Sequence, residues 1–362
     1  MRDRSGAAPR PFPFPTAMLR MAKRGIFSLA RRLQLFSIAR RSAWRRDRLL
    51  ILCYHSVSLA DEHEWNGELY MSQELLRARF AMLRDSGYSV LPLDEGVRLL
   101  YEGTLPPASV ALTFDDGMYN FAARAVPVLE EFGYPATVYV ATYYCEHQLP
   151  VFPIACGYVS WAGRAAGSCS ASGLAEGDAP LRVSTEAERR ASVKRIDAWV
   201  TERELSAAEK DRVAEEFASR LGVDYGRLRR ERMFNLMSPD EVRALAGSRV
   251  DVQLHTHRHR APDDAALFVR EIEDNRRSLA AMSGPAWRPH HFCYPSGKHR
   301  PAMLPLLRGA GIETATTCAP GLATRATDPL LLPRFVDTSF QAPLAFEAWA
   351  SGFALLLPRR TA

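Results

Sequence analysis

Val110-Ala-Leu-Thr-Phe-Asp-Asp-Gly117 is an apolar run that ends in two adjacent carboxylates and a glycine. This pattern predicts a buried strand whose carboxyl end delivers polar side chains to a site. Asp115 and Asp116 repel each other, and in a strand their side chains would point to opposite faces. A bound cation would relieve that repulsion, whereas an ordinary acidic turn after a strand would need no partner. The choice between them depends on what the rest of the chain supplies.

A second apolar run, Val250-Asp-Val-Gln-Leu-His-Thr-His-Arg-His259, ends in a cluster of histidines. His255 and His259 are four residues apart, which places two imidazoles on one side of a helical turn. Two neutral imidazoles and one carboxylate suit a transition metal ion with open positions. His257 stands between them and is expected to face away.

These two segments, together with Phe292-Cys-Tyr-Pro-Ser-Gly297, resemble the polysaccharide deacetylases of the NodB-homology, carbohydrate esterase type. The resemblance covers roughly residues 48–340 and is interrupted by an insertion. It implies an α/β fold, namely a distorted (β/α)7 barrel of the NodB type. The first two motifs are specific in combination, and the third is weaker.

The alternation of apolar strands and amphipathic helices agrees with that fold, because it predicts parallel pairing with right-handed crossovers. The alternation breaks between about residues 142 and 237, where charged helices over 184–221 indicate a mostly helical insertion. We therefore expect a basic N-terminal segment, a catalytic domain that carries the insertion, and a C-terminal helix. Their ranges are 1–48, 49–340 (insertion about 142–237) and 341–362.

The resemblance also assigns roles to residues of the motifs. The first aspartate of the pair, Asp115, would be the general base. Asp116, His255 and His259 would hold a divalent metal ion, for which zinc is the first choice and cobalt, nickel or iron also fit such donors. The backbone N–H of Ser296 would donate a hydrogen bond to the oxyanion.

Two departures from the family pattern concern catalysis. Cys293 stands where an arginine commonly orients the base, and among nearby cations Arg334 is favoured as its replacement because it ends a late apolar run. A late leucine-x-histidine segment, which supplies the acid, is absent after residue 300. His55, within Tyr54-His-Ser56, resembles the Tyr-His corner of the poly-N-acetylglucosamine deacetylase branch and is expected to be the acid. Alternatively, His55 is a core histidine whose ring nitrogens are hydrogen-bonded to backbone groups.

The expected function is that of a hydrolase of carbon–nitrogen (non-peptide) bonds. It would remove the acetyl group from an N-acetylated sugar in a polysaccharide or lipid-linked glycan, with the metal as cofactor. Two alternatives stay open: hydrolysis of another amide on the same fold, and a glycan-binding protein that has lost turnover. The adjacent carboxylates argue against the last one, because a binder need not keep a repelling pair.

Charge is concentrated at the N-terminus. Residues 1–48 hold thirteen Lys or Arg against two acids, a balance of +11 that leaves −5 for the remainder of a chain with net charge +6. The mildly acidic remainder argues against nucleic acid as a partner. Within the basic segment, residues 18–40 predict one amphipathic helix, either bound to anionic membrane or docked on its own domain.

The sequence shows no secretory signal and no run of about 20 apolar residues that could cross a bilayer. The six cysteines form no C-x-x-C pair, which favours free thiols in a reducing compartment. We therefore expect a cytoplasmic protein, with association to the membrane as an open addition. A second amphipathic helix is expected over residues 344–357.

Overall fold

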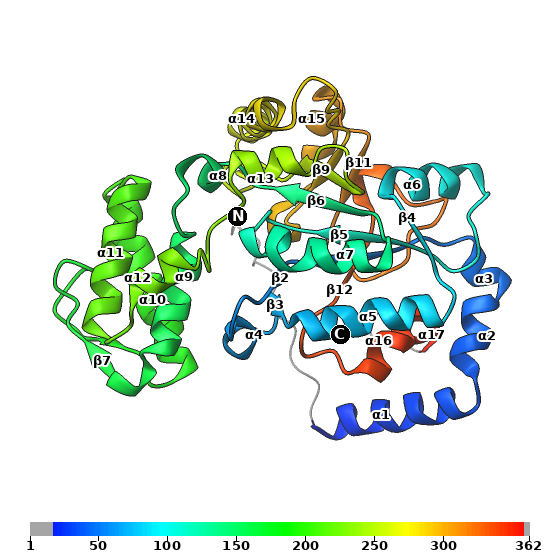
Figure 1. Cartoon of the computed structure of the whole chain (residues 1–362), viewed down its shortest axis with the longest axis horizontal. Coiled ribbons are helices and arrows are strands. Elements are labelled where there is room, and N and C mark those ends of the chain that lie inside the picture. The colour runs from blue at the N-terminus through cyan, green and yellow to red at the C-terminus, as the bar shows by residue number, and fades with distance from the viewer. Residues whose placement is uncertain (1–16, 358–362) are drawn as a thin grey trace, which may run out of the picture.

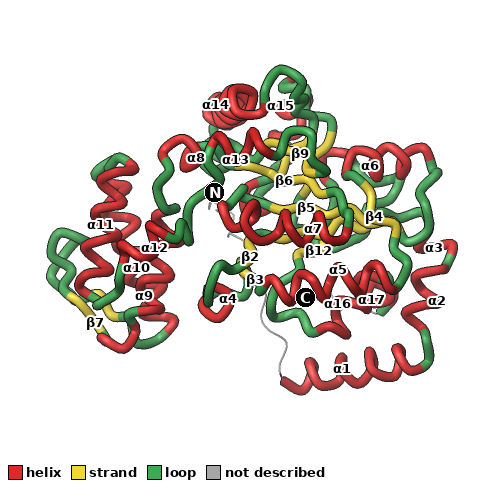
Figure 2. Tube along the Cα trace, viewed as in Figure 1, coloured by secondary structure: helices red, strands yellow, loops and turns green. Residues whose placement is uncertain are grey.

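The computed structural model describes the backbone of residues 17–357 and the side chains from residue 24 onward. At its centre lies a parallel sheet in the order β11-β10-β9-β6-β5-β1-β12, with β4 paired to β5. Figure 2 shows these strands in the middle of the molecule with helices around them. The strands are β1 (Leu50–Tyr54), β4 (Ser89–Leu91), β5 (Ser109–Phe114), β6 (Ala136–Val140), β9 (Val250–Leu254), β10 (His291–Cys293), β11 (Thr314–Thr316) and β12 (Phe335–Val336).

The sheet curls so that its two ends approach each other. Thr316 of β11 forms a parallel bridge with Leu332. Three residues later the same segment becomes β12, which pairs with β1 at the other end of the sheet. The predicted α/β fold, a distorted barrel of parallel strands with a helical segment in mid-chain, is confirmed. Because all these strands are parallel, their carboxyl ends meet at one rim of the barrel.

Helices cover the barrel, and α6 closes the end where the strands begin. That end is called the lower end below, and the opposite rim, where the strands end, is called the upper rim. In α6, the residues Leu93, Val97 and Leu100 pack into an apolar cluster with Leu49 and other interior residues. The helix that follows β5 begins as a π-helical turn, η1 (Phe121–Ala125), before it becomes α-helical. The covering helices are α5 (Gln73–Asp85), α6 (Leu93–Glu102), α7 (Val126–Phe132), α13 (Pro239–Ala244), α14 (Ala265–Ser283) and α15 (Met303–Gly309).

Several short strands, helices and turns lie outside the central sheet. Strand β2 pairs in parallel with β3, and the short helix α4 lies between them in the chain. Within residues 17–357, three 3-10 turns and the short helix α8 connect longer elements. These elements are β2 (Ser56–Val57), α4 (Glu62–Trp65), β3 (Tyr70–Met71), α8 (Tyr143–His147), η2 (Arg164–Ala166), η3 (Pro295–Gly297) and η4 (Pro329–Leu331).

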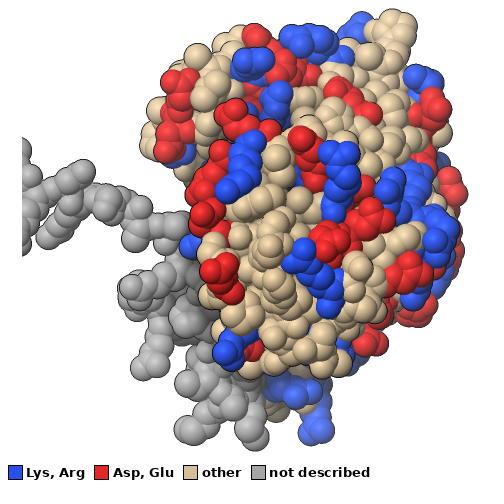
Figure 3. All heavy atoms as spheres, turned by 90° about the vertical axis from the view of Figure 1, so that its left-hand side faces the viewer, with Lys and Arg blue, Asp and Glu red and all other residues tan. Residues whose placement is uncertain are grey.

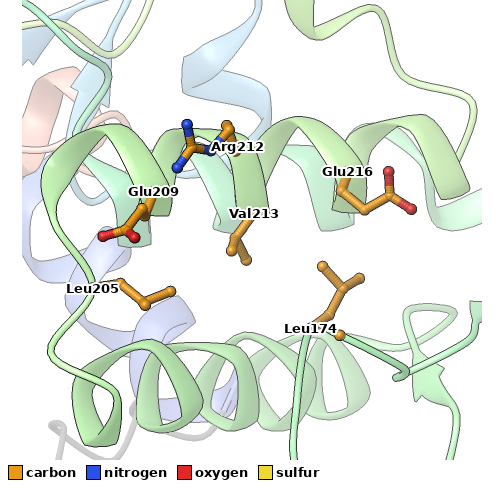
Figure 4. Close-up of a pocket in the computed structure, with 7 residues that line it drawn as sticks. Leu174, Leu205, Glu209, Arg212, Val213 and Glu216 are labelled. Carbon is orange, nitrogen blue, oxygen red and sulfur yellow. The ribbon is translucent and has the colours of Figure 1, made fainter.

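The insertion is a small helical unit with a core of its own, at the left of Figure 1 beyond α8. The aromatic residues Phe152, Tyr158 and Trp161 contribute to that core, so they pack the insertion rather than face a ligand. A shallow hollow beside α11 is lined only by insertion residues, including Glu209 and Arg212 (Figure 4). The elements are α9 (Phe152–Ala162), β7 (Ser168–Cys169), β8 (Leu181–Arg182), α10 (Glu186–Glu202), α11 (Ala207–Arg220) and α12 (Tyr225–Arg230).

The two ends of the described chain pack against each other at the bottom of Figure 1. The single N-terminal helix predicted from periodicity is broken at Gln34, whose φ is 56°, and the C-terminal one at Gly352, whose φ is 82°. Phe27, Phe36 and Phe353 form the contact between them. The segments are α1 (Ala17–Arg32), α2 (Leu35–Arg41), α3 (Ala43–Arg46), α16 (Pro343–Ala350) and α17 (Phe353–Leu356).

No helix within residues 17–357 is both long enough and apolar enough to span a bilayer. The face seen in Figure 3 carries acidic and basic side chains that are intermingled. Such a surface produces no large field of one sign over that face. The expectation that nucleic acid is not a partner stays a prediction.

Gly117 turns the chain sharply after β5, and this turn is a sensitive point of the fold. Its φ is +75°, and a Cβ there would lie 2.8 Å from Val140 Cγ1. We expect Gly117→Ala to lower the free energy of unfolding by about 1–2 kcal/mol for the left-handed backbone, plus the clash. Gly133→Ala is the control, because its φ is +64° and nothing lies within 4 Å. Equal losses in urea unfolding would show that the clash with Val140 is relieved at no cost.

Candidate metal centre

Three side chains predicted as metal ligands meet at the upper rim of the barrel. Asp116 follows the carboxyl end of β5, and His255 and His259 follow β9. One carboxylate oxygen, Asp116 Oδ1, lies 3.3 Å from His255 Nε2 and 3.2 Å from His259 Nε2. Left-handed backbone at Asp116 (φ 72°) and His259 (φ 52°) turns both side chains toward this point. The structure therefore brings the three atoms into one cluster.

The cluster has the dimensions of a transition-metal site. In tetrahedral zinc sites the bonds of about 2.0–2.1 Å place neighbouring ligand atoms about 3.3–3.4 Å apart. The observed separations of 3.2 and 3.3 Å match that spacing. Asp116 Oδ1 is also buried without a hydrogen-bond donor, although two imidazoles adjoin it. A buried carboxylate oxygen in that state is costly, and a cation would satisfy it.

His255 is held in the orientation that a ligand needs. Its Nδ1 donates a hydrogen bond to the carbonyl oxygen of Cys293 at 2.9 Å, which leaves the lone pair of Nε2 directed at Asp116. Its backbone N–H donates to Asn275 Oδ1 at 2.9 Å. His257 points elsewhere, because its Nδ1 is hydrogen-bonded to the hydroxyl of Thr142 at 2.8 Å. His257 is thus outside the cluster, as its position between the ligands suggested.

Glu271 of α14 fixes the loop that carries His259. This carboxylate is buried and accepts hydrogen bonds from the backbone N–H of Arg258 at 2.8 Å and from Arg260 Nε at 2.7 Å. Its main-chain oxygen accepts from the N–H of His257 at 3.0 Å. Neither Glu271 nor Asn275 was predicted from the sequence. The available signal was a pair of polar residues four apart on the apolar face of a helix.

We expect Glu271→Ala to weaken zinc binding by about 10–100-fold, because outer partners of metal ligands have effects of this size. The loop would lose the three hydrogen bonds that this carboxylate accepts from Arg258 and Arg260. Isothermal titration of metal-free protein with zinc measures the change. Glu273→Ala, which removes an exposed carboxylate from the same helix, should bind zinc like the parent chain. Equal affinity in both variants would mean that the loop holds its shape without Glu271.

Asp115 forms a bidentate ion pair with Arg334. The NH1 and NH2 groups of Arg334 donate to Oδ1 and Oδ2 of Asp115, each at 2.7 Å. The same guanidinium donates to Thr113 Oγ1 at 3.1 Å, to the carbonyl of Thr317 at 3.0 Å and to Cys293 Sγ at 3.1 Å. Arg334 thus lies beside Cys293, the residue that stands where the resemblance implies an arginine. The side chain is fully buried and fully hydrogen-bonded.

The charges of the centre favour a cation. Burial raises the pKa of Asp115, but Arg334 more than offsets this and holds that pKa well below its usual range. Burial also raises the pKa of Asp116, and the two adjoining imidazoles reverse the effect. Burial lowers the pKa of His255, yet the neighbouring carboxylates leave it raised. Both carboxylates therefore stay ionised, and they draw positive charge to the point between them.

His55 lies across from Asp115. Its Nε2 is 3.9 Å from Asp115 Oδ2, and its side chain is 18% exposed. Its Nδ1 is buried without a hydrogen-bond partner, so no backbone group satisfies the ring there. Two thiols, Cys53 and Cys293, each lie 3.5 Å from the same carboxylate oxygen. Burial raises the pKa of both thiols well above the usual value, so both stay protonated beside Asp115.

Ser296 lies in a short turn on the same rim. Its φ of 54° is left-handed, and Gly297 after it donates its own N–H to the carbonyl of Tyr294 at 2.8 Å. The N–H of Ser296 has no hydrogen-bond acceptor within residues 17–357. It is therefore free to meet a ligand oxygen.

Comparison with known proteins identifies the family of this chain. The family pattern described as polysaccharide deacetylase matches residues 102–315. Over 104 residues the chain is 33% identical to the poly-beta-1,6-N-acetyl-D-glucosamine N-deacetylase of Escherichia coli (strain K12). That match covers 28% of this chain and 15% of the E. coli protein, so it spans only a small part of the relative's length.

Two solved structures share the fold. IcaB from Ammonifex degensii superimposes with a TM-score of 0.52 at 18% identity, over 84% of this chain and 97% of that one. A de-N-acetylase from Aggregatibacter actinomycetemcomitans gives a TM-score of 0.51 at 15% identity, over 83% of this chain and 99% of that one. At these identities the likeness concerns architecture alone.

Proposed function

Because this chain belongs to the polysaccharide deacetylase family, we propose that it is a metal-dependent N-deacetylase that hydrolyses the acetamido group of an N-acetylated sugar in a polysaccharide or lipid-linked glycan. The observation that carries the proposal is the cluster of Asp116, His255 and His259 with the ionised Asp115 beside it. The alternative is a glycan-binding protein that lost its activity because Cys293 stands in place of an arginine. The site favours it less, because the guanidinium of Arg334 donates to both oxygens of Asp115.

In this mechanism each residue has a separate task. Asp116, His255 and His259 would hold a divalent ion, with zinc favoured by the mixed nitrogen and oxygen donors. Such an ion lowers the pKa of water and polarises the amide carbonyl. Asp115 would take the proton from the attacking water. Its depressed pKa keeps it ionised and able to accept that proton.

The remaining groups act on the oxygen and nitrogen of the amide. Arg334 holds both oxygens of Asp115 in place, so the base enters the reaction in one orientation. The free N–H of Ser296 donates a hydrogen bond to the oxyanion as the carbonyl carbon becomes tetrahedral. His55 gives a proton to the departing amine nitrogen. These groups complete the set that amide hydrolysis requires.

The test of the function is release of acetate from N-acetylglucosamine oligomers by the full chain. We expect acetate release that a chelator abolishes and that added zinc restores. Binding of the oligomers without acetate release would favour a glycan-binding protein. Acetate release that is insensitive to the chelator would remove the metal from the proposal.

His55→Ala is expected to lower kcat by about 10²-fold, at the lower end of the range for acid–base groups because water can replace the donor. The metal ligands stay intact, so zinc content should not change. Acetate release and bound zinc are measured on the same preparation. His63→Ala removes another partly buried histidine and is the control. Full turnover in His55→Ala would remove the proton-donor role.

We also propose that the N-terminal helices contact anionic membrane. Four of the exposed large apolar side chains lie within residues 26–38, with exposed fractions of 47% (Ile26), 58% (Leu29), 57% (Leu33) and 62% (Ile38). The opposite side of this segment is buried against α16 and α17. The docked and membrane-bound arrangements are thus compatible, because each uses a different face. Exposed Arg24 and Arg32 flank the apolar side chains and suit acidic lipid.

Co-sedimentation with phosphatidylglycerol vesicles tests this contact. The full chain should pellet with them, and a Leu29→Glu, Leu33→Glu variant should stay in solution. Leu267→Glu, at a leucine of α14 that is 47% exposed, is the matched control. Equal pelleting of all three proteins would overturn the membrane proposal. We further propose a cytoplasmic location, which the six unpaired cysteines support.

A further inference from the structure

A second group of metal-type side chains lies at the lower end of the barrel. His290 and His291 stand at the amino end of β10, and Asp94 lies in the first turn of α6, which closes that end. Cys293, at the other end of the same short strand, belongs to the upper rim, where its carbonyl holds His255. The two clusters are therefore separate.

Both imidazoles turn the same nitrogen toward one carboxylate oxygen. His290 Nδ1 donates to the carbonyl of Arg288 at 3.0 Å, so the lone pair is on Nε2, which lies 3.5 Å from Asp94 Oδ1. His291 Nδ1 is hydrogen-bonded to the hydroxyl of Thr314, and its Nε2 lies 4.0 Å from the same oxygen. This arrangement repeats that of His255, whose Nδ1 is also occupied.

The unpaired Nε2 of His291 is the main evidence for a ligand at this cluster. The His291 side chain is 1% exposed, and its Nε2 is buried without any hydrogen-bond partner. Leaving a buried polar nitrogen unpaired destabilises the folded chain. Burial, and to a smaller extent the adjoining His290, lowers the pKa of His291 to about 3, so the ring is neutral. In the tautomer whose Nδ1 donates to the Thr314 hydroxyl, the lone pair lies on Nε2.

The backbone around the two histidines is fixed. The N–H groups of His290 and His291 both donate to Oε1 of Gln253, at 3.1 and 2.9 Å. Gln253 is fully buried, and its amide nitrogen donates to Asp251 Oδ1 at 3.1 Å. Of the three side chains only Asp94 is exposed, and a shift of its carboxylate can shorten its distances to both imidazoles.

We propose that Asp94, His290 and His291 form a second metal site, which takes a divalent ion of the zinc type and ties α6 to β10. Two imidazoles and one carboxylate are the donors that zinc, cobalt or nickel prefer. The site lies away from the proposed catalytic centre, so its role is structural. Binding there stabilises the closed lower end of the barrel.

Equilibrium dialysis of the metal-free full chain against zinc, followed by elemental analysis, tests the proposal. We expect two zinc ions per chain, one in His290→Ala, one in Asp116→Asn and none in the double variant. His147→Ala, which removes an exposed histidine of α8, should keep two. Zinc should also raise the melting temperature of Asp116→Asn but not that of the double variant.

The two metal proposals fail in different ways. If the parent chain and His290→Ala bind the same number of zinc ions, the second site does not exist. If Asp116→Asn binds as many as the parent chain, the catalytic site is wrong and the second one is not affected. Folding of each variant is checked by circular dichroism. Should His290→Ala unfold, Asp94→Asn replaces it, because that side chain is exposed.

Discussion

Replacing Asp115 by Asn is expected to lower kcat for acetate release by about 10²–10⁴-fold, the range typical of an acid–base group. Asn keeps the shape of the side chain but cannot take up the proton of the attacking water. The cluster of Asp116, His255 and His259 is unchanged, so bound zinc should stay at the level of the parent chain. Steady-state kinetics and elemental analysis on one preparation measure both quantities.

The control for Asp115→Asn is Asp337→Asn. Asp337 is also buried and paired with an arginine, since Arg79 Nε lies 2.9 Å from its carboxylate. It touches none of the proposed ligands, so its replacement should cost stability and leave kcat unchanged. If Asp115→Asn retains full turnover with zinc bound, another group is the base. If it loses zinc together with activity, its effect is on the metal site.

Replacing Arg334 by Met should lower the free energy of unfolding by about 3–5 kcal/mol, because it leaves a buried carboxylate without its partner. The guanidinium is fully buried, and all its contacts are to protein groups. Met has a similar length but offers no donor. Urea unfolding monitored by circular dichroism measures the loss. The variant should also lose acetate release, since Asp115 would no longer be fixed.

A double-mutant cycle separates this pair from ordinary packing. The combination of Asp115→Asn with Arg334→Met should be less destabilising than the sum of the single changes, because no charge is left unpaired. Arg334→Lys is the second comparison, and it should lose less than Met since one charged contact survives. Additive losses would mean that the two side chains contribute independently and that their pairing is incidental.

Much of the barrel could be predicted because its strands are short apolar runs bounded by polar corners. Val110–Phe114 and Val250–Leu254 lie inside β5 and β9 as expected. The terminal helices were less predictable. Periodicity continues through Gln34 and Gly352, so nothing in the apolar pattern marked the breaks. The breaks serve to fold the two segments against each other, which is a tertiary requirement.

The candidate site was predictable where a motif concentrates its residues, as in Asp115-Asp116 and His255 to His259. Arg334 is different, because it is far from these motifs in the chain. Only its place at the end of an apolar run pointed to the rim, and the ion pair itself arises from the curl that brings β12 beside β1. Glu271 and Asn275 gave weaker signals still, since burial of a polar residue on a helix depends on what covers that helix.

Anomalous diffraction at the zinc absorption edge, from crystals of the full chain grown with zinc, shows whether Asp116, His255 and His259 bind a metal ion. We expect a peak bounded by Asp116 Oδ1, His255 Nε2 and His259 Nε2, because both ring nitrogens already lie within 3.3 Å of the carboxylate oxygen. A map without density at that position, or with the two rings turned out of the cluster, would contradict this expectation.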